Sequence, residues 1–339
     1  MSSSSLKDKT ANALLWGGIN NGAQQVLNLG FGIFLARLLS PADYGMVGML
    51  TIFSLIATSL QESGFISGLN RKKYITDADY NAVFWFNVLC SSGVYVILFF
   101  CAPLIAAWYR QPVLVPLARL SFLTFVISSL GTSPRAWLFR NMKVRETALL
   151  TLGALTVSGI CGVCLAFNGF AFWGIAIQNL VYCTMMSLGS WWFSGWHPSW
   201  HINLQPLRGM IGFSSKILAT NIFTHINNNI FSIFFGRLYG EKTVGYYNQA
   251  NKWTTMGSNT LVGMLWSVTQ PLFARFDKND LERMQRVFRK LLRFTAFLSC
   301  PALFGLALIA PEFITIAITE KWMTSAHLMQ VLCIGGAFM

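Results

Sequence analysis

Polar side chains recur at helical spacing within an apolar segment near the start of the chain. On one predicted helix face, at intervals of four and three residues, lie Asn21, Gln25 and Asn28. Two hundred residues later, the same three offsets hold Asn221, His225 and Asn228. Polar groups are costly in lipid and must face protein or a watery cavity. Each stripe therefore lines a cavity or, in the alternative interpretation, hydrogen-bonds neighbouring helices.

Three basic residues also lie inside apolar segments, namely Arg119, Lys216 and Lys252. At 1.5 Å per residue, each is roughly 10–12 Å from the nearer end of its segment. Glu62 is the one acid at comparable depth. An excess of unpaired bases favours a site for an anionic group such as a phosphate or diphosphate. The alternative is that these long side chains reach back to the membrane surface.

Histidines and cysteines predict no metal centre and no cofactor. His225 either carries a proton, because its charge changes near neutral pH, or only hydrogen-bonds within its helix. Cys161 and Cys164 have the spacing of a redox or zinc pair, but they lie in an apolar segment with no second pair and no histidine nearby. We therefore predict a structural role for both cysteines. His197 and His201 are too few to form a zinc site.

Apolar segments long enough to cross a bilayer must position these residues. Of the 339 residues, 54% are hydrophobic and only 11% are charged, whereas soluble domains carry about 25% charged residues. The apolar blocks of roughly 20 residues predict membrane-spanning helices. We expect ten spans: 11–36, 44–67, 81–108, 112–134, 147–167, 170–193, 209–234, 244–272, 292–311 and 325 to the end.

The net charge of +13 reports orientation and does not indicate a nucleic-acid partner. With a cytoplasmic N-terminus, 17 of the 25 basic residues fall in the predicted inner segments and 5 in the outer ones. This asymmetry is the positive-inside pattern of a multi-pass membrane protein. Residues 280–294 alternate apolar and basic side chains at helical spacing, which predicts an amphipathic helix on the cytoplasmic membrane surface.

An internal repeat organises the chain. Residues 21–45 and 221–245 are identical at 8 of 25 positions without a gap, including the pairs Arg37/Arg237 and Gly45/Gly245. Six predicted spans precede the second copy, so both copies have the same orientation in the membrane. We expect an all-α membrane bundle of two parallel-repeat lobes, residues 1–200 with six spans and residues 201–339 with about four.

Other features of the repeat lead to two further expectations. Arg37 and Arg237 are predicted to be structural pins at equivalent helix ends and not parts of a substrate site. The second lobe has fewer spans than the first, and the apolar run VLCIGGAFM is the last of the sequence. We therefore expect the second lobe to be incomplete and the chain to be truncated.

Four spaced motifs carry a resemblance to a known family: FLARLLSPADYGMVGMLTIF, GLNRKKYITDADYNAVFW, RAWLFRNMKVRETAL and VGYYNQANKW. With these motifs, the chain resembles Wzx-type polysaccharide exporters of the multidrug/oligosaccharidyl-lipid/polysaccharide (MOP) superfamily. The similarity is greatest to the colanic-acid and teichuronic-acid exporter branch and extends over essentially the whole chain.

The resemblance implies a flippase of the bacterial inner membrane. Such a protein moves an undecaprenyl-diphosphate-linked oligosaccharide from the cytoplasmic to the periplasmic leaflet, as its two lobes rock about a central cavity. Its partners would be the lipid-linked oligosaccharide, membrane lipids and the polysaccharide polymerase or glycosyltransferase machinery. The assignment of substrate contact to Lys216, Lys252 and the asparagine stripes rests on spacing and not on the family.

Two other functions stay open. A multidrug antiporter of the same superfamily would bind organic cations and would need intramembrane acids, for which Glu62 is the candidate. A scaffold for a polysaccharide synthase complex would transport nothing. The sequence lacks phosphate-binding loops, dinucleotide-binding loops and paired catalytic carboxylates, so we do not expect an enzyme.

Overall fold

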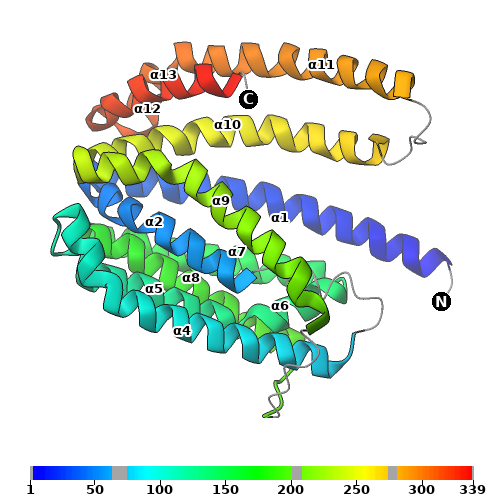
Figure 1. Cartoon of the computed structure of the whole chain (residues 1–339). Coiled ribbons are helices and arrows are strands. Elements are labelled where there is room, and N and C mark those ends of the chain that lie inside the picture. Colours follow the sequence, from blue (N-terminus) through cyan, green and yellow to red (C-terminus); the bar gives the residue numbers. More distant parts are fainter. Residues whose placement is uncertain (1–2, 63–74, 201–207, 274–280, 338–339) are drawn as a thin grey trace.

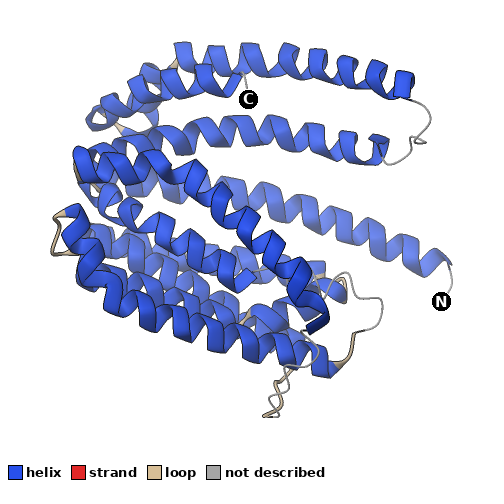
Figure 2. Ribbon diagram, viewed as in Figure 1, coloured by secondary structure: helices blue, strands red, loops and turns tan. Residues whose placement is uncertain are grey.

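The computed structural model describes residues 3–62, 75–200, 208–273 and 281–337, and these residues form helices and short connections without a strand (Figures 1 and 2). The prediction of an all-α bundle is thus confirmed. The helices are α1 Ser3–Leu38, α2 Pro41–Glu62, α4 Asp77–Tyr109, α5 Leu114–Leu130, α6 Thr132–Arg140, α7 Val144–Phe167, α8 Ala171–Ser194, α9 Arg208–Leu238, α10 Glu241–Phe273, α11 Leu281–Leu308, α12 Ala310–Ile318, the 3₁₀ turn η2 Glu320–Trp322 and α13 Met323–Ala337.

The helices converge at one end of the molecule and spread apart at the other (Figure 1). At the converging end, which we call the closed end, lie the connections 39–40, 110–113, 239–240 and 319–322. The N-terminus lies at the opposite end, which we call the open end.

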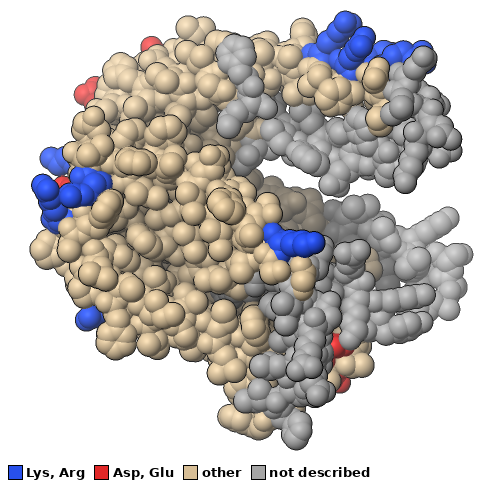
Figure 3. Space-filling view, in the orientation of Figure 1, with Lys and Arg blue, Asp and Glu red and all other residues tan. Residues whose placement is uncertain are grey.

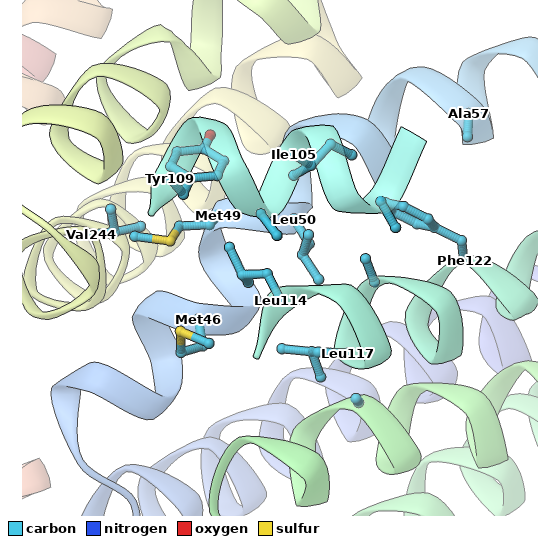
Figure 4. Packing of buried hydrophobic residues seen from close by; sticks show 14 of the residues in the cluster. Met46, Met49, Leu50, Ala57, Ile105, Tyr109, Leu114, Leu117, Phe122 and Val244 are labelled. Atoms are coloured by element: carbon cyan, nitrogen blue, oxygen red, sulfur yellow. The ribbon is translucent and has the colours of Figure 1, made fainter. Parts of the chain in front are cut away.

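Large apolar side chains of α2, α4 and α5 form the core of the first half. Figure 4 shows Met49 and Leu50 of α2 between Tyr109 of α4 and Leu114 of α5, with Val244 of α10 at the edge of the same cluster. All five residues are less than 9% exposed. Burial of each such side chain contributes about 1.5–3 kcal/mol relative to exposure, although lipid replaces water around the outer faces of the bundle.

A second core joins α10, α12 and α13 to the end of α1. Trp253, Ile314 and Trp322 are buried there, and Ala36 of α1 is 0% exposed among them. The first helix therefore ends in the second half of the protein, although its sequence belongs to the first repeat.

The two repeats meet through equivalent glycines. A Cβ atom on Gly45 would lie 1.7 Å from the carbonyl oxygen of Glu241, and one on Gly245 would lie 1.8 Å from that of Pro41. Pro41 and Glu241 are themselves equivalent positions of the repeat. The contact is reciprocal, as expected for two copies related by an approximate two-fold axis. Glycine is required at both positions because the backbones of α2 and α10 touch there.

At the closed end, Arg37 holds α1 against α12. Its Nη2 donates to the Ile316 carbonyl (2.6 Å), and its Nε donates to the Ala317 carbonyl (2.8 Å). In return, Lys321 Nζ and Trp322 Nε1 donate to carbonyls at the end of α1 (2.6 and 2.9 Å). Desolvation lowers the pKa of Lys321, and the Asp43 carboxylate partly opposes this shift. We call these four hydrogen bonds the α1–α12 clasp.

The equivalent arginine of the second repeat has a different partner. The guanidinium of Arg237 lies 5.3 Å from the centre of the Trp108 ring, at the end of α4. Nearby, Gln111 Nε2 donates to Glu241 Oε2 (2.8 Å). Both arginines therefore connect their helix to the other half at the closed end, which agrees with the predicted structural role.

The helices differ from the predicted spans in two respects. Five of the described helices are long and apolar enough to cross a membrane, or six if the α5–α6 pair, bent by 44°, counts as one span. Among the described residues, α1, α9 and α10 contribute none of the five. The predicted amphipathic stretch 280–294 and the ninth predicted span, 292–311, form one continuous helix, α11, which begins at Leu281. Its sequence contains no helix breaker before Pro301.

Candidate functional site

A cavity of about 460 Å³ lies where the two halves meet, and we call it the central cavity. Most of its wall comes from α2 and α10, with one residue each from α8 and α9. Its lining residues are Tyr44, Val47, Gly48, Thr51, Ile175, Asn229, Asn248, Gln249, Asn251, Lys252, Thr255 and Met256. This volume lies within the range of small-molecule sites, about 300–1,000 Å³.

Lys252 supplies a positive charge to the central cavity. Its Nζ lies 2.8 Å from the position that a Cβ atom on Gly32 of α1 would occupy, and 5.8 Å from the centre of the Trp253 ring. Glycine at position 32 thus leaves room for the ammonium group. Among the described residues that line this cavity, none is acidic. The site is therefore suited to an anion, because a buried ammonium group is stabilised by a negative partner.

Amide side chains of α10 and α9 surround Lys252. The Oδ1 atom of Asn248 accepts a hydrogen bond from Ser232 Oγ (2.8 Å), and Asn229 Nδ2 donates to the His225 carbonyl (3.0 Å). Gln249 is 1% exposed, and both polar atoms of its amide are buried without a hydrogen-bond partner. Such a group is costly unless a water molecule or a ligand satisfies it.

Of the three predicted bases, Lys252 alone lines the central cavity. The guanidinium of Arg119 lies 4.1 Å from the centre of the Phe99 ring on α4, with its Nε buried and unpartnered. Lys216 is exposed, eight residues after the start of α9. The predicted acid Glu62 ends α2, and its side chain lies outside the described residues.

None of the residues of the two predicted polar stripes is among those that line the central cavity. On α1, Asn21, Gln25 and Asn28 are exposed. On α9, the side chains of Asn221 and His225 are half-buried and that of Asn228 is exposed. The α9 residue that reaches the cavity is Asn229, one position further along.

Sequence reasoning found Lys252 but missed its polar neighbours on α10. Asn248, Asn251 and Thr255 lie four and one residues before and three residues after Lys252 and line the same cavity. The helical-face argument that singled out α1 and α9 would have found them, had it been applied to the eighth predicted span.

No metal site occurs in the part of the chain that the structure describes, where no three His, Cys, Asp or Glu side chains cluster. Cys161 and Cys164 lie on α7 as free thiols, the first half-buried and the second exposed.

Residues 34–327 match the protein family described as "Polysaccharide biosynthesis protein". The chain is also 25% identical to the lipopolysaccharide biosynthesis protein WzxC of Escherichia coli (strain K12), over 98% of this chain and 68% of that protein.

Two solved structures have the same fold. The lipid II flippase MurJ in an inward closed conformation matches with a TM-score of 0.75 and 14% identity, over 96% of this chain and 73% of that one. An inward-facing multidrug resistance MATE family transporter of the MOP superfamily matches with a TM-score of 0.67 and 16% identity, over 93% of this chain and 78% of that one. The fold is thus that of multi-pass transporters.

Proposed function

This chain belongs to the polysaccharide biosynthesis protein family, and on that premise we propose that it flips a polyprenyl-diphosphate-linked oligosaccharide across the cytoplasmic membrane. The observation that carries the proposal is Lys252, a cation in a cavity between the two halves whose described lining has no acid. Relatives support the same class of substrate, because WzxC is named for lipopolysaccharide biosynthesis and MurJ is a lipid II flippase.

In this mechanism the diphosphate binds Lys252. The ammonium group forms charge-assisted hydrogen bonds with phosphate oxygens, and the amides of Asn248 and Gln249 provide further donors. The buried amide of Gln249, which has no hydrogen-bond partner within the protein, then gains one. The polyprenyl tail stays in the bilayer, because the apolar chain gains nothing by entering a polar site.

Alternating access requires that the two halves, 1–200 and 201–339, move as lobes, and that the Gly45–Gly245 contact near the closed end separates when that end opens. In the state described here, the α1–α12 clasp closes one end, while the helices spread at the other. We assign the open end to the cytoplasm, as the positive-inside pattern of the sequence indicates. The substrate would enter there, and opening of the clasp would release it to the periplasmic leaflet.

The basic turns of α11 fit this orientation. Arg286, Arg289, Lys290 and Arg293 are exposed at the open end, where Figure 3 shows Lys and Arg side chains gathered. Phe288 and Leu292 are exposed beside them (52% and 53%). This combination suits a cytoplasmic membrane surface with anionic lipids.

Export of organic cations is the second candidate, because a MATE family transporter has the same fold. A cation site would need a carboxylate, and the described lining of the central cavity contains a lysine in its place. The charge of the site therefore favours the anionic substrate, and the fold favours transport over catalysis.

The test is translocation of undecaprenyl-diphosphate-linked oligosaccharide in proteoliposomes. We expect Lys252→Ala to lower the rate at least about tenfold, since a hydrogen bond to a charged group contributes about 1.5–3 kcal/mol. Lys252→Arg should retain much of the activity, and Lys242→Ala, which removes an exposed charge at the closed end, should retain all of it. The translocation rate of Lys216→Ala shows how much the exposed Lys216 contributes independently of Lys252. Unchanged transport in a protein lacking both Lys216 and Lys252 would contradict the anion site.

A further inference from the structure

A second cavity of about 500 Å³ lies within the first half, between α2, α5, α7 and α8. We call it the first-half cavity. Val47, Thr51 and Ile175 line both this cavity and the central cavity. The two cavities are therefore neighbours that share a wall, and one bound molecule can extend from Lys252 into the first half.

The first-half cavity is lined by apolar and by uncharged polar side chains. Eight of its lining residues have hydroxyl or amide groups, and none of the described residues in its wall is acidic or basic. Gln178, Asn179 and Tyr182 of α8 provide donors and acceptors on one side. An ion would find no counter-charge here, and an apolar drug would leave these polar groups unsatisfied.

Hydroxyl groups on the opposite walls are available to a ligand. The Oγ atom of Ser121 on α5 is buried without a hydrogen-bond partner. Thr58 Oγ1 donates to the Ser54 carbonyl (2.9 Å), and Ser158 Oγ donates to the Leu155 carbonyl (3.2 Å). Both oxygens keep lone pairs for a donor in the cavity. A wall of mixed donors and acceptors matches a sugar ring, whose hydroxyls both donate and accept.

We propose that the first-half cavity binds the uncharged sugar next to the diphosphate, so that the site has two parts. Lys252 holds the anionic group, and the hydroxyls and amides of α2, α5, α7 and α8 hold the first sugar ring. This inference rests on the proposed function, and it adds a sugar-binding subsite built from one half of the protein. It also predicts that a lipid diphosphate with a sugar binds more tightly than one without.

A pair of matched triple variants tests the subsite. The cavity variant combines Ser121→Ala, Thr58→Val and Tyr182→Phe, each of which removes one hydroxyl from the cavity at nearly constant volume. The control variant combines Ser129→Ala, Thr184→Val and Tyr95→Phe, on α5, α8 and α4 outside both cavities. Thr184 Oγ1 donates to the carbonyl four residues before it, as Thr58 does, so the loss to the helix itself is equal.

The readout is binding of two probes to the purified protein, undecaprenyl diphosphate alone and undecaprenyl diphosphate bearing one glucose. We expect the cavity variant to bind the glucose-bearing lipid about tenfold more weakly, because it loses three hydrogen bonds. It should bind the sugar-free lipid as the wild type does, and the control variant should leave both affinities within about twofold.

Two results would overturn the inference and are distinguishable from one another. If the wild type binds both lipids and the cavity variant weakens both equally or neither, the sugar subsite is wrong and the diphosphate site stands. If the wild type binds neither lipid, the proposed function fails, and the subsite fails with it.

Discussion

At the residue scale, the placement of one lysine determines the chemistry that the site can perform. Lys252 is half-buried in the central cavity, and its ammonium group lies where a side chain on Gly32 would begin. A flexible four-carbon stem could place that charge in many positions. The absence of a side chain on Gly32 leaves room for the ammonium group beside α1.

Gly32→Ala should therefore reduce transport without unfolding the protein. The new Cβ would displace the end of a flexible side chain, which costs little, but the ammonium group would leave its place. We expect an unchanged melting temperature and a severalfold lower translocation rate. Gly30→Ala is the control, because a Cβ there meets nothing within 4 Å. Equal rates for the two variants would show that the position of Lys252 against α1 is unimportant.

Gln249 provides a second test at this scale. Its amide is buried without partners, so Gln249→Leu removes an unsatisfied group and should raise the melting temperature or leave it unchanged. The same variant should bind undecaprenyl diphosphate more weakly, because the amide is proposed to contact the diphosphate. A stabilised protein with unaltered affinity would contradict that contact.

At the element scale, the contact of α2 with α10 determines how the two repeats are joined. Gly45 and Gly245 permit the backbones to touch, and Gly48 lies against the side chains of Val244 and Asn248. Gly45 and Gly245 belong to the motif that the two halves share. The repeat thus preserves residues needed where the copies meet, and its arginines serve the same interface at the closed end.

Gly45→Ala should destabilise the protein strongly. The new methyl group would overlap the Glu241 carbonyl, which is backbone and cannot move aside without separating the helices. Overpacking of this kind costs about 1–3 kcal/mol or more, so the melting temperature in detergent should fall by several degrees. Gly93→Ala on α4, where a Cβ meets nothing within 4 Å, should be neutral or stabilising. A melting temperature equal to that of Gly93→Ala would refute the close approach.

At the scale of the whole molecule, the α1–α12 clasp is one set of contacts that must break for the closed end to open. The clasp joins the end of the first helix to α12 and η2 of the second half. A charged donor strengthens three of its four hydrogen bonds, but Arg37 is exposed, so its contribution is smaller than at a buried site. A change of about 1.4 kcal/mol would shift the balance between the two states tenfold.

Arg37→Ala should therefore raise the fraction of molecules in which the helices have separated at the closed end. A cysteine at Thr51, introduced into a cysteine-free protein, reports access to both cavities. We expect faster labelling of this cysteine by a membrane-impermeant maleimide from the periplasmic side when Arg37 is replaced. Lys242→Ala, which removes a charge at the same end, should leave the rate unchanged. Equal labelling of the two variants would mean that the clasp does not hold this end closed.

The sequence alone determined the class of the protein, its helical architecture and its internal repeat. Hydropathy and periodicity are properties of short segments, so α2, α4, α7 and α8 were predictable from composition and length. The glycine and arginine pairs were predictable because the two copies of the repeat can be aligned with each other in a single sequence. The basic residue that lines the central cavity, Lys252, was also among the candidates.

Only the tertiary structure decided which polar residues share a cavity. The rotation of each helix and its neighbours determine whether a side chain faces lipid, protein or a cavity, and these depend on packing over the whole bundle. For this reason Arg119 packs on Phe99, Asn229 replaces Asn228 in the cavity wall, and α10 contributes most of the amides. The first-half cavity likewise combines side chains of four helices, from Val47 to Tyr182, a juxtaposition that no local pattern contains.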